Sequence, residues 1–600
     1  MKAPDSIEAV QVQHDDQAKG DPLSEKQTAR LDDLGEQIDP NAIGGNLSDM
    51  PKGYYRSVAF LGTLSAVCLG NACHYLGFVV PASIISVINA DIGPSPAYTW
   101  ISLVWVLTVA ITYSILGRLS DIMGRRWFFL GGNCLGLVGN IVVGTAHSIP
   151  VAIGGTTMIG IAGAVQLSFP LILGELVPNK HRAHANMAAY MVGLPFSAFG
   201  PVIARAFILQ TKLGWRWPYF VSAIMSVFAV VLLFFCYHPP TLGMIHSKSG
   251  RKSAIHLIDI GGVVLYSSGL FLLLLGLSWG GGQYAWKSGE VIGTIVGGGV
   301  IIMVFGFYEA YMPLSYPLVP IRLWTKLPYV ATIMTASIGA TVYYSMSILW
   351  PMQVTALYAA GTSHAGWLSC AAGAGTSLGN LIGCLTCGSL GHQKWQMVVS
   401  AVGMTVFMGA MAASDQRTVG LAVAFMVLGA MFVGIMEAVA FVTAQLCLEP
   451  EDIGLASGTM GTVRSALSTI ATTIYLAILN NKKAAYITNH VDVVASQNGV
   501  TDAQLTKILA GFASGNINAA GVSQSVLDML QDVYKTGYSQ SLRVVYLASI
   551  SFGAIAIIFA FYSPNLETKF NDEVSRRLHG SDLTWKKRAT TEAVAALGQV

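Results

Sequence analysis

The chain has 600 residues, of which 53% are hydrophobic and only 11% are Asp, Glu, Lys or Arg. Soluble domains carry about 25% charged residues, so this composition excludes an ordinary soluble protein and predicts that the lipid bilayer surrounds most of the chain. The formal net charge of +3, without a basic run interleaved with aromatic residues, argues against nucleic acid as a partner.

The first segment, residues 1–54, is predicted to be a disordered acidic tail. Its first fifty residues hold eleven acidic and four basic side chains and no apolar core. It is therefore expected to be neither a signal peptide nor a folded domain, and the first transmembrane helix is expected to direct membrane insertion.

Long runs without charged residues follow this tail, and about 20 apolar residues of helix cross the hydrocarbon core of a bilayer. Two of the runs are long enough for two helices each and contain a break, at His147-Ser-Ile-Pro150 and near Gly361-Thr-Ser-His364. The sequence thus predicts about fourteen transmembrane helices, at 57–90, 92–117, two within 127–174, 187–209, 218–237, 257–279, 291–311, two within 327–393, 395–413, 419–446, 454–479 and 544–563.

The distribution of basic residues predicts the orientation of this bundle. An even number of helices places both tails on one side, where the short loops carry eleven Lys and Arg residues against four in the opposite short loops. Cytosolic loops are the ones enriched in basic residues. Both tails, including the C-terminal tail 566–600, are therefore expected in the cytosol.

One loop on the opposite side, residues 482–541, is long and contains two helix signals. Thr501-Asp-Ala-Gln504 is typical of a capping box before apolar residues at helical spacing, and Val526, Leu530 and Val533 indicate a second amphipathic segment. Two interpretations stay open: an extracellular lid, or helices that lie on the membrane surface or the bundle. We favour the second.

The eight cysteines fall inside or at the ends of apolar runs, which argues against a disulfide framework. Cys384 and Cys387 form a CxxC pattern, but it lies in a glycine-rich apolar helix. We interpret this pair as packing residues.

The turn between predicted helices 2 and 3 carries a ten-residue pattern from 117 to 126. Its glycines permit a tight connection, and its acidic residue can pair with an arginine or a helix N-terminus, so that the cluster can latch one state of a bundle that has two. The pattern resembles the signature loop of the major facilitator superfamily, with the latch residues Gly117, Arg118, Asp121, Gly124, Arg125 and Arg126.

Further motifs follow in the order expected for that superfamily. Glu175 to Arg182 follows predicted helix 4, Gly200 and Pro201 resemble the antiporter motif of helix 5, and Gly214 to Phe220 matches a pattern of fungal members. The whole is similar to the fungal fourteen-helix branch that contains trichothecene efflux pumps, with siderophore-iron transporters as relatives.

The resemblance implies an all-α membrane protein with the major-facilitator fold, in which two six-helix halves surround a cavity at the middle of the membrane. The halves would be residues 55–238 and 327–565, and residues 239–326 would insert two extra helices between them. The second half then contains a degenerate counterpart of the signature loop, Gly388-Ser-Leu-Gly391-His-Gln-Lys394, whose missing Asp implies an asymmetric latch. The helix 4 arginine of drug:proton antiporters is also missing, and the helix 5 motif is incomplete.

Ionisable residues inside predicted helices are the candidates for proton and substrate handling, because their burial is expensive. Glu437 has no basic neighbour on its own helix, and burial disfavours its charged form, as a proton carrier requires. His74 is a second candidate, although a lone helix histidine is more often structural. Arg205 and Arg464 are expected to attract an anionic group or to snorkel to the interface.

Aromatic and small polar residues would line a cavity for a bulky apolar compound, although most aromatics in such bundles are packing residues. The possible lining residues are Trp105, Gln166, Phe169, Tyr343, Tyr344 and Trp350.

We therefore predict a secondary active transporter, not an enzyme, that exports a small apolar substrate such as a toxin, a drug or a trichothecene-like sesquiterpenoid in exchange for protons. A plasma-membrane location is expected, with vacuolar or vesicle membranes as alternatives. Proton-coupled import of a ferric siderophore and a membrane sensor on a transporter fold remain alternative functions. The motifs imply no cofactor, no metal site and no obligate protein partner.

Overall fold

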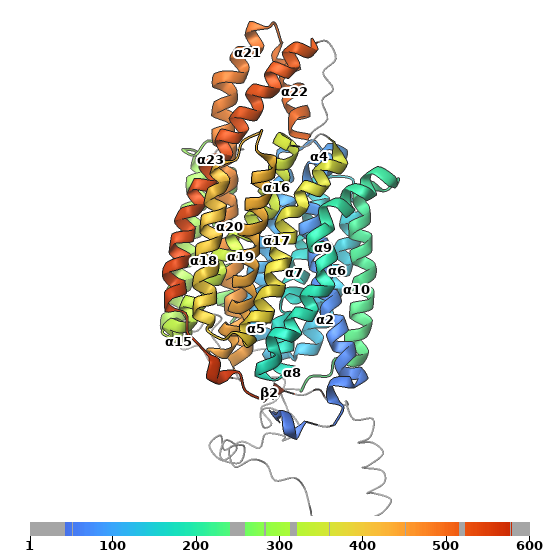
Figure 1. The fold of residues 1–600 in the computed structure, drawn as a ribbon, viewed down its shortest axis with the longest axis vertical. Coiled ribbons are helices and arrows are strands. Elements are labelled where there is room, and N and C mark those ends of the chain that lie inside the picture. The colour runs from blue at the N-terminus through green and yellow to red at the C-terminus, as the bar shows by residue number, and fades with distance from the viewer. Residues whose placement is uncertain are drawn as a thin grey trace, which may run out of the picture.

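The computed structural model describes residues 43–50, 52–240, 259–280, 284–312, 321–358, 361–449, 452–514, 522–576 and 578. Nearly all of this chain is helical, and long helices run side by side in one elongated bundle (Figure 1). A helix pairs its backbone N–H and C=O groups within its own segment, which hydrocarbon requires of any chain that crosses it.

The N-terminal half holds six long helices and three short ones: α2 (Val58–Gly77), α3 (Val79–Ala82), α4 (Ile85–Ile92), α5 (Trp100–Met123), α6 (Arg125–Gly144), α7 (Ile149–Leu167), α8 (Phe169–Leu176), α9 (Arg182–Gln210) and α10 (Trp217–Cys236). The inserted region contributes α13 (Ile260–Trp279), α14 (Gly289–Tyr311) and the short α15 (Ile321–Trp324). The C-terminal half contains α16 (Leu327–Gln353), α17 (Thr362–Ser389), α18 (Gln393–Ala410), α19 (Val419–Leu446), α20 (Ile453–Tyr486) and α23 (Gln524–Tyr562).

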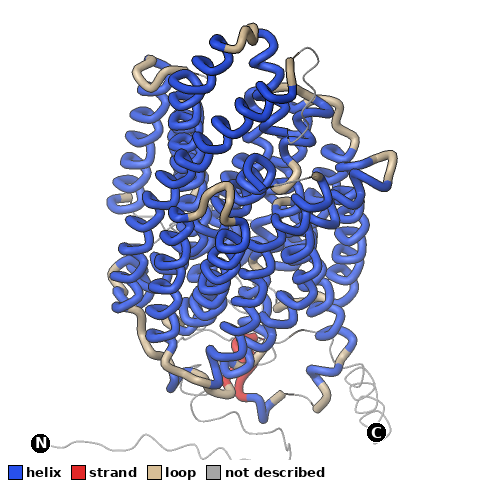
Figure 2. Tube along the Cα trace, turned by 45° about the horizontal axis from the view of Figure 1, so that its top comes forward, coloured by secondary structure: helices blue, strands red, loops and turns tan. Residues whose placement is uncertain are grey.

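Short elements complete the described chain. Two helices, α21 (Asp492–Gln497) and α22 (Asp502–Ser514), lie between α20 and α23, and two strands, β1 (Ile43–Asn46) and β2 (Glu573–Arg576), pair in antiparallel fashion. The 3-10 helices are Leu47–Asp49, Tyr54–Arg56, Pro96–Thr99, Asn179–His181, Gly214–Arg216, Met411–Ala413 and Glu567–Lys569, and the π-helices are Val354–Tyr358 and Ile487–Val491. The strands mark one end of the bundle, here called the tail side (Figure 2). Helices α21 and α22 mark the other end, here called the far side (Figure 1).

The number of membrane-spanning helices agrees with the prediction. Among the described residues, thirteen helices are long and apolar enough to cross a bilayer. The fourteenth is α16, which has 27 residues and carries no charged side chain. Its many Ser and Thr residues make it less apolar, but several of their hydroxyls donate to backbone carbonyls of the same helix, as Thr335 does to Ala331.

Each half meets the other along two pairs of helices, α5 with α20 and α9 with α17. The inserted helix α13 packs against α5 and α20, so the extra pair covers one seam between the halves. On the tail side α5 and α20 approach closely at Gly117 and Gly458. A Cβ atom on Gly458 would stand 2.7 Å from the Cα of Gly117, so this position does not accept a larger residue unless the helices separate.

The structure differs from the prediction in the region 482–541. Helix α20 continues past the predicted end of helix 13 and α23 begins well before the predicted start of helix 14, so both project beyond the bundle on the far side (Figure 1). One of the two bonds of the predicted capping box is present, because Gln504 Oε1 accepts from the Thr501 backbone N at 3.0 Å, and the same oxygen accepts from Thr501 Oγ1 at 2.9 Å. Helix α22 packs on α23 and contacts α4 and the π-helix Val354–Tyr358, so it rests on both halves.

Part of the N-terminal tail differs from the expectation of disorder. Ile43–Asn46, within the tail predicted to be disordered, forms β1, and Glu573–Arg576 of the C-terminal tail forms β2 beside it. Buried side chains from both segments, including Tyr54, Val574 and Leu578, join an apolar cluster with residues of α8.

Candidate functional site: a cavity between the two halves

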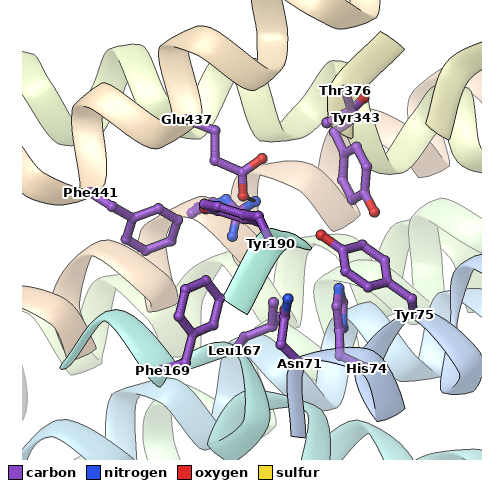
Figure 3. Close-up of a pocket in the computed structure, with 11 residues that line it drawn as sticks. Asn71, His74, Tyr75, Leu167, Phe169, Tyr190, Tyr343, Thr376, Glu437 and Phe441 are labelled. Carbon is purple, nitrogen blue, oxygen red and sulfur yellow. Dashed lines mark hydrogen bonds and ion pairs between the residues drawn. The ribbon is translucent and has the colours of Figure 1, made fainter. Parts of the chain in front are cut away.

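A small enclosed cavity lies at the middle of the bundle, where helices of both halves converge. It is lined by Asn71, His74, Tyr75, Leu167, Phe169, Tyr190, Tyr343, Thr376, Glu437, Phe441 and Arg464. The N-terminal half supplies the first six of these residues and the C-terminal half supplies the others. Figure 3 shows Glu437 on one wall pointing toward Asn71 and His74 on the other.

Glu437 and Arg464 form an ion pair in the wall of this cavity. Arg464 Nη2 donates to Glu437 Oε1 across the packing of α19 on α20. Both residues line the cavity, and the carboxylate is the more exposed of the two, at 14% against 2% for the arginine side chain. The guanidinium also stands 5.3 Å from the ring centroid of Phe441 and 5.6 Å from that of Tyr344.

Nitrogen Nη1 of Arg464 is buried and has no hydrogen-bond partner among the described residues. The pair therefore leaves one donor of the cation unsatisfied beside the cavity. Such a group attracts water or an acceptor on a ligand, because an unpaired buried donor costs about 1–3 kcal/mol.

His74 lies on the opposite wall and is also fully buried. Its ring centroid is 5.1 Å from that of Trp105, and its Nδ1 atom has no partner among the described residues. Beside it, Asn71 donates to the backbone carbonyl of Ala189 at 2.9 Å, which fixes this amide against α9. Three of the four ionisable candidates, Glu437, Arg464 and His74, thus face the same cavity.

The cavity is too small in this arrangement for an organic ligand. It leaves about 10 Å³ in which the centre of a water molecule fits, which is room for about one water. Sites for drug-sized ligands have volumes of about 300–1,000 Å³. The structure is therefore a closed arrangement, and a substrate enters only after the halves move apart.

The signature loop lies on the tail side and joins α5 to α6. Gly124 adopts φ 92°, which favours glycine and explains the turn, whereas Gly117 lies inside α5 and is required by the close contact with α20. Arg125 forms a buried ion pair with Glu175 at the end of α8, and Arg126 donates to the carbonyl of Phe234 at 2.6 Å. The side chains of Arg118 and Asp121 lie outside the described residues.

The counterpart loop between α17 and α18 recruits a carboxylate from elsewhere in the chain. Glu567, which follows α23, accepts from the backbone N of His392 at 2.9 Å and lies 3.0 Å from its Nδ1. Gly391 (φ 61°) and His392 (φ 52°) form the turn. The acidic residue missing from this loop is thus supplied from the C-terminal segment, which the loop sequence alone does not indicate.

Arg205 lies outside the cavity, toward the far side. It is 4% exposed, so it does not snorkel to the interface, and it donates to Ser369 and Thr355 of the other half at 3.2 and 3.4 Å. Gly200 packs α9 against α3, since a Cβ atom there would lie 2.6 Å from Val80 Cγ2, and Pro201 is buried in the same helix.

Sequence reasoning missed several lining residues and overestimated others. Tyr190 and Thr376 line the cavity but carry no sequence signal that separates them from packing residues. Phe169 and Tyr343 do line it, whereas the four other possible lining residues do not line the described cavity: Trp105, Gln166, Tyr344 and Trp350.

Comparison with known proteins gives a consistent result. A family model described as "Fungal trichothecene efflux pump (TRI12)" matches residues 27–593. The chain is 26% identical over 593 residues to a trichothecene efflux pump of Trichoderma arundinaceum, covering 94% of this chain and 97% of that protein. It is 26% identical over 558 residues to one of Fusarium sporotrichioides, covering 91% and 92%.

Among solved structures, the proton:xylose symporter XylE bound to 6-bromo-6-deoxy-D-glucose is similar to this chain, with a TM-score of 0.55 and 14% identity. The match covers 88% of this chain and 99% of the symporter. At this identity the likeness concerns the fold alone, and it confirms the predicted major-facilitator architecture.

Proposed function

Because the chain belongs to the fungal trichothecene efflux pump family, we propose that it exports a small, largely apolar compound of the trichothecene-like sesquiterpenoid class in exchange for protons. Efflux by a secondary transporter agrees with the relatives, which include efflux pumps of several fungi. These relatives do not favour siderophore import. The substrate class and the coupling ion are the new elements of the proposal.

The Glu437–Arg464 ion pair in the cavity wall carries the proposal of proton coupling. Protonation of Glu437 would leave Arg464 as an uncompensated buried cation, and breaking a buried pair in this way costs about 3–5 kcal/mol. Gain of a proton by Glu437 therefore breaks the pair, and loss of the proton restores it. A carboxylate that exchanges an ion-pair partner for a proton couples proton binding to a change in the cavity wall, as exchange of protons for substrate requires.

The chemistry of the cavity wall supports a largely apolar substrate with a few hydrogen-bonding groups. Five of its residues are aromatic, namely Phe169, Phe441, Tyr75, Tyr190 and Tyr343, and they supply apolar surface when the halves separate. The amide of Asn71, the hydroxyl of Thr376 and the free donor of Arg464 would orient oxygen atoms of the substrate. An oxygenated sesquiterpenoid matches this combination.

We also propose how the protein is oriented, in which membrane it lies, and that it has no enzymatic activity. Both tails lie in the cytosol, because the tail side carries most of the basic residues of the short loops. The plasma membrane is the location that export from the cell requires. The chain acts as a transporter and not as an enzyme, and it needs no protein partner for this cycle.

Intracellular accumulation of a trichothecene tests the proposal. Cells that express the protein should retain less toxin than cells without it, and both a protonophore and Glu437→Gln should abolish the difference. Glu290→Gln is the matched control, because Glu290 is an exposed residue at the start of α14, away from the cavity. It should leave export unchanged.

Two outcomes would contradict the proposal. Full export by Glu437→Gln that remains sensitive to the protonophore would exclude Glu437 as the coupling residue. Higher accumulation of a ferric siderophore in expressing cells, without toxin export, would replace export by import.

A further inference from the structure

The segment that follows α23 runs across the tail side of both halves. Its described residues are 565–576 and 578, and it includes the 3-10 helix Glu567–Lys569 and strand β2. The N-terminal strand β1 pairs with β2, with Gly45 opposite Val574. We call residues 565–576 and 578, which contain β2, the tail clasp.

The clasp is attached to the C-terminal half first. Asn565 Oδ1 accepts from the backbone N of Lys394 at 3.1 Å, and Gln393 Oε1 accepts from the backbone N of Leu566 at 3.2 Å. Together with the Glu567–His392 contact, these bonds hold the segment on the loop between α17 and α18. The attachment is also covalent, because α23 belongs to the same half.

The clasp then reaches the N-terminal half. The backbone N of Lys180 donates to the carbonyl of Asn571 at 3.1 Å, and the ammonium group of Lys180 pairs with Asp572. Arg182 Nη2 donates to Ser575 Oγ at 3.2 Å. The 3-10 helix Asn179–His181 and the start of α9 are thus tied to the chain end of the other half.

The strand also touches the signature-loop ion pair. Arg576 Nε lies 3.5 Å from Glu175 Oε1, the carboxylate that pairs with Arg125. Glu175 is 4% exposed, so both cations meet it away from bulk water, where ionic contacts are screened little. The clasp therefore contacts the residue that links the signature loop to α8.

Apolar burial strengthens this attachment. Val574 and Leu578 are each 2% exposed, and they belong to one apolar cluster with Met50 and Tyr54 of the N-terminal segment and with Leu176 of α8. Tyr54 Oη also accepts from the backbone N of Leu578 at 3.1 Å. Both chain ends thus seal the same tail-side surface.

From these contacts we infer that the tail clasp holds the tail side of the transporter closed, and that it must detach from the N-terminal half before the halves open on that side. The clasp is fixed to one half and bound to the other, so separation of the halves breaks the bonds at Lys180, Arg182 and Glu175 and the pairing of β2 with β1. The inference concerns the gate and holds whatever the substrate is.

Cys384 is a native reporter of tail-side opening. It is 0% exposed near the tail-side end of α17, in the apolar cluster that also contains Leu171 and Tyr190 of the other half. Its alkylation by a polar maleimide in purified protein, measured by mass spectrometry of its peptide, requires the halves to separate there. Cys384→Ser identifies the signal, and no substrate is needed.

Removal of the clasp should accelerate this alkylation several-fold. The test chain ends after Pro564, and the matched control ends after Leu578, which keeps every described contact of the clasp and deletes only residues 579–600. Val574→Asp, which places a charge in the buried cluster, should act like the shorter chain. In the control chain, Cys384 should be alkylated as slowly as in the full-length protein.

A cross-link between the clasp and the N-terminal half should have the opposite effect on the alkylation of Cys384. Lys180→Cys with Asp572→Cys, oxidised to a disulfide, would tie the clasp to the N-terminal half, and alkylation of Cys384 should become slower than in the reduced protein. Reductant should restore the rate, and each single-cysteine variant should not respond to oxidation. Equal rates in the folded truncated chain and the full chain, or no change on cross-linking, would overturn the inference.

Discussion

At the residue scale, the cavity combines an ion pair with a free donor in a nearly waterless space. Arg464 depends on Glu437 because the two rings beside its guanidinium offset only part of the cost of burying a cation. Loss of the Glu437 carboxylate alone should therefore lower the free energy of unfolding more than loss of both charges does.

A comparison of single and double variants tests this expectation. Glu437→Gln should lower the free energy of unfolding by about 3–5 kcal/mol, because it leaves Arg464 uncompensated. Glu437→Gln with Arg464→Met should recover most of that loss. Thermal unfolding of the purified proteins in detergent measures both values, and a double variant less stable than the single variant would disprove the argument.

Asp91, on the far side outside the membrane-spanning segments, provides a prediction on pH. The hydrogen bond from Trp215 and the ion pair with Arg216 lower the pKa of Asp91 below its ordinary value of 3.8. A carboxyl with a lowered pKa in the folded state contributes stability above that ordinary value and loses it as the pH falls through the lowered pKa. The side chain is 48% exposed, so the contribution is at most about 1 kcal/mol.

Asp91→Asn should therefore lower the unfolding temperature slightly at pH 6. The difference from the natural protein should shrink as the pH falls below 3.8. Trp215→Phe, which removes the first hydrogen-bond donor, should retain part of the pH dependence through Arg216. A difference that persists unchanged at the lowest pH would contradict the role of the carboxylate.

The sequence indicates candidate residues more readily than the contacts between them. Glu437, Arg464 and His74 stand out because the burial of an ionisable group within an apolar helix costs free energy at any position in the membrane. The pairing of Glu437 with Arg464 could not be predicted, because it depends on the packing of two different helices. Tyr190 could not be recognised either, since aromatic packing residues and lining residues share one chemistry.

At the element scale, the close contact of α5 with α20 determines how tightly the tail side closes. Gly458 faces backbone atoms of α5, which cannot move aside as a side chain can. The helices must therefore separate if any Cβ atom is added at this point.

Gly458→Ala should thus weaken tail-side closure and accelerate the alkylation of Cys384. Gly299→Ala in α14 is the matched control, because a Cβ atom there would have no neighbour within 4 Å. The rate in Gly299→Ala should equal that of the natural protein. Equal rates in both variants would show that the α5–α20 contact does not limit opening.

Most helix boundaries inside the membrane were predictable, and those outside it were not. The first two helices are exceptions, because the predicted helix 57–90 is divided into α2, α3 and α4, and the predicted helix 92–117 is α5, which spans Trp100–Met123. Apolar helices such as α10 begin and end near the predicted residues, because charges and prolines mark the edges of the bilayer. The projecting parts of α20 and α23 are amphipathic and polar, so hydropathy gave no reason to join them to the membrane helices. The capping box of α22 was predictable because its signal is local.

At the scale of the whole molecule, the membrane itself made most of the architecture predictable. It forces each apolar segment into a helix, and the order of the motifs then indicates the superfamily. Such reasoning could not predict the strand pairing of the tail clasp, because β1 and β2 come from opposite ends of the chain and each has only four residues. Their pairing depends on where the folded bundle places the two ends.

The unbroken course of α23 from the membrane into the far-side projection has a mechanical consequence. A helix of 39 residues moves as a rod, so a rotation of the C-terminal half about the cavity swings the tip of the projection through a larger arc than any residue inside the bilayer. The position of the tip outside the membrane therefore reports the conformation of the bundle inside it. A soluble binder that held the tip against α4 would stop transport without entering the lipid.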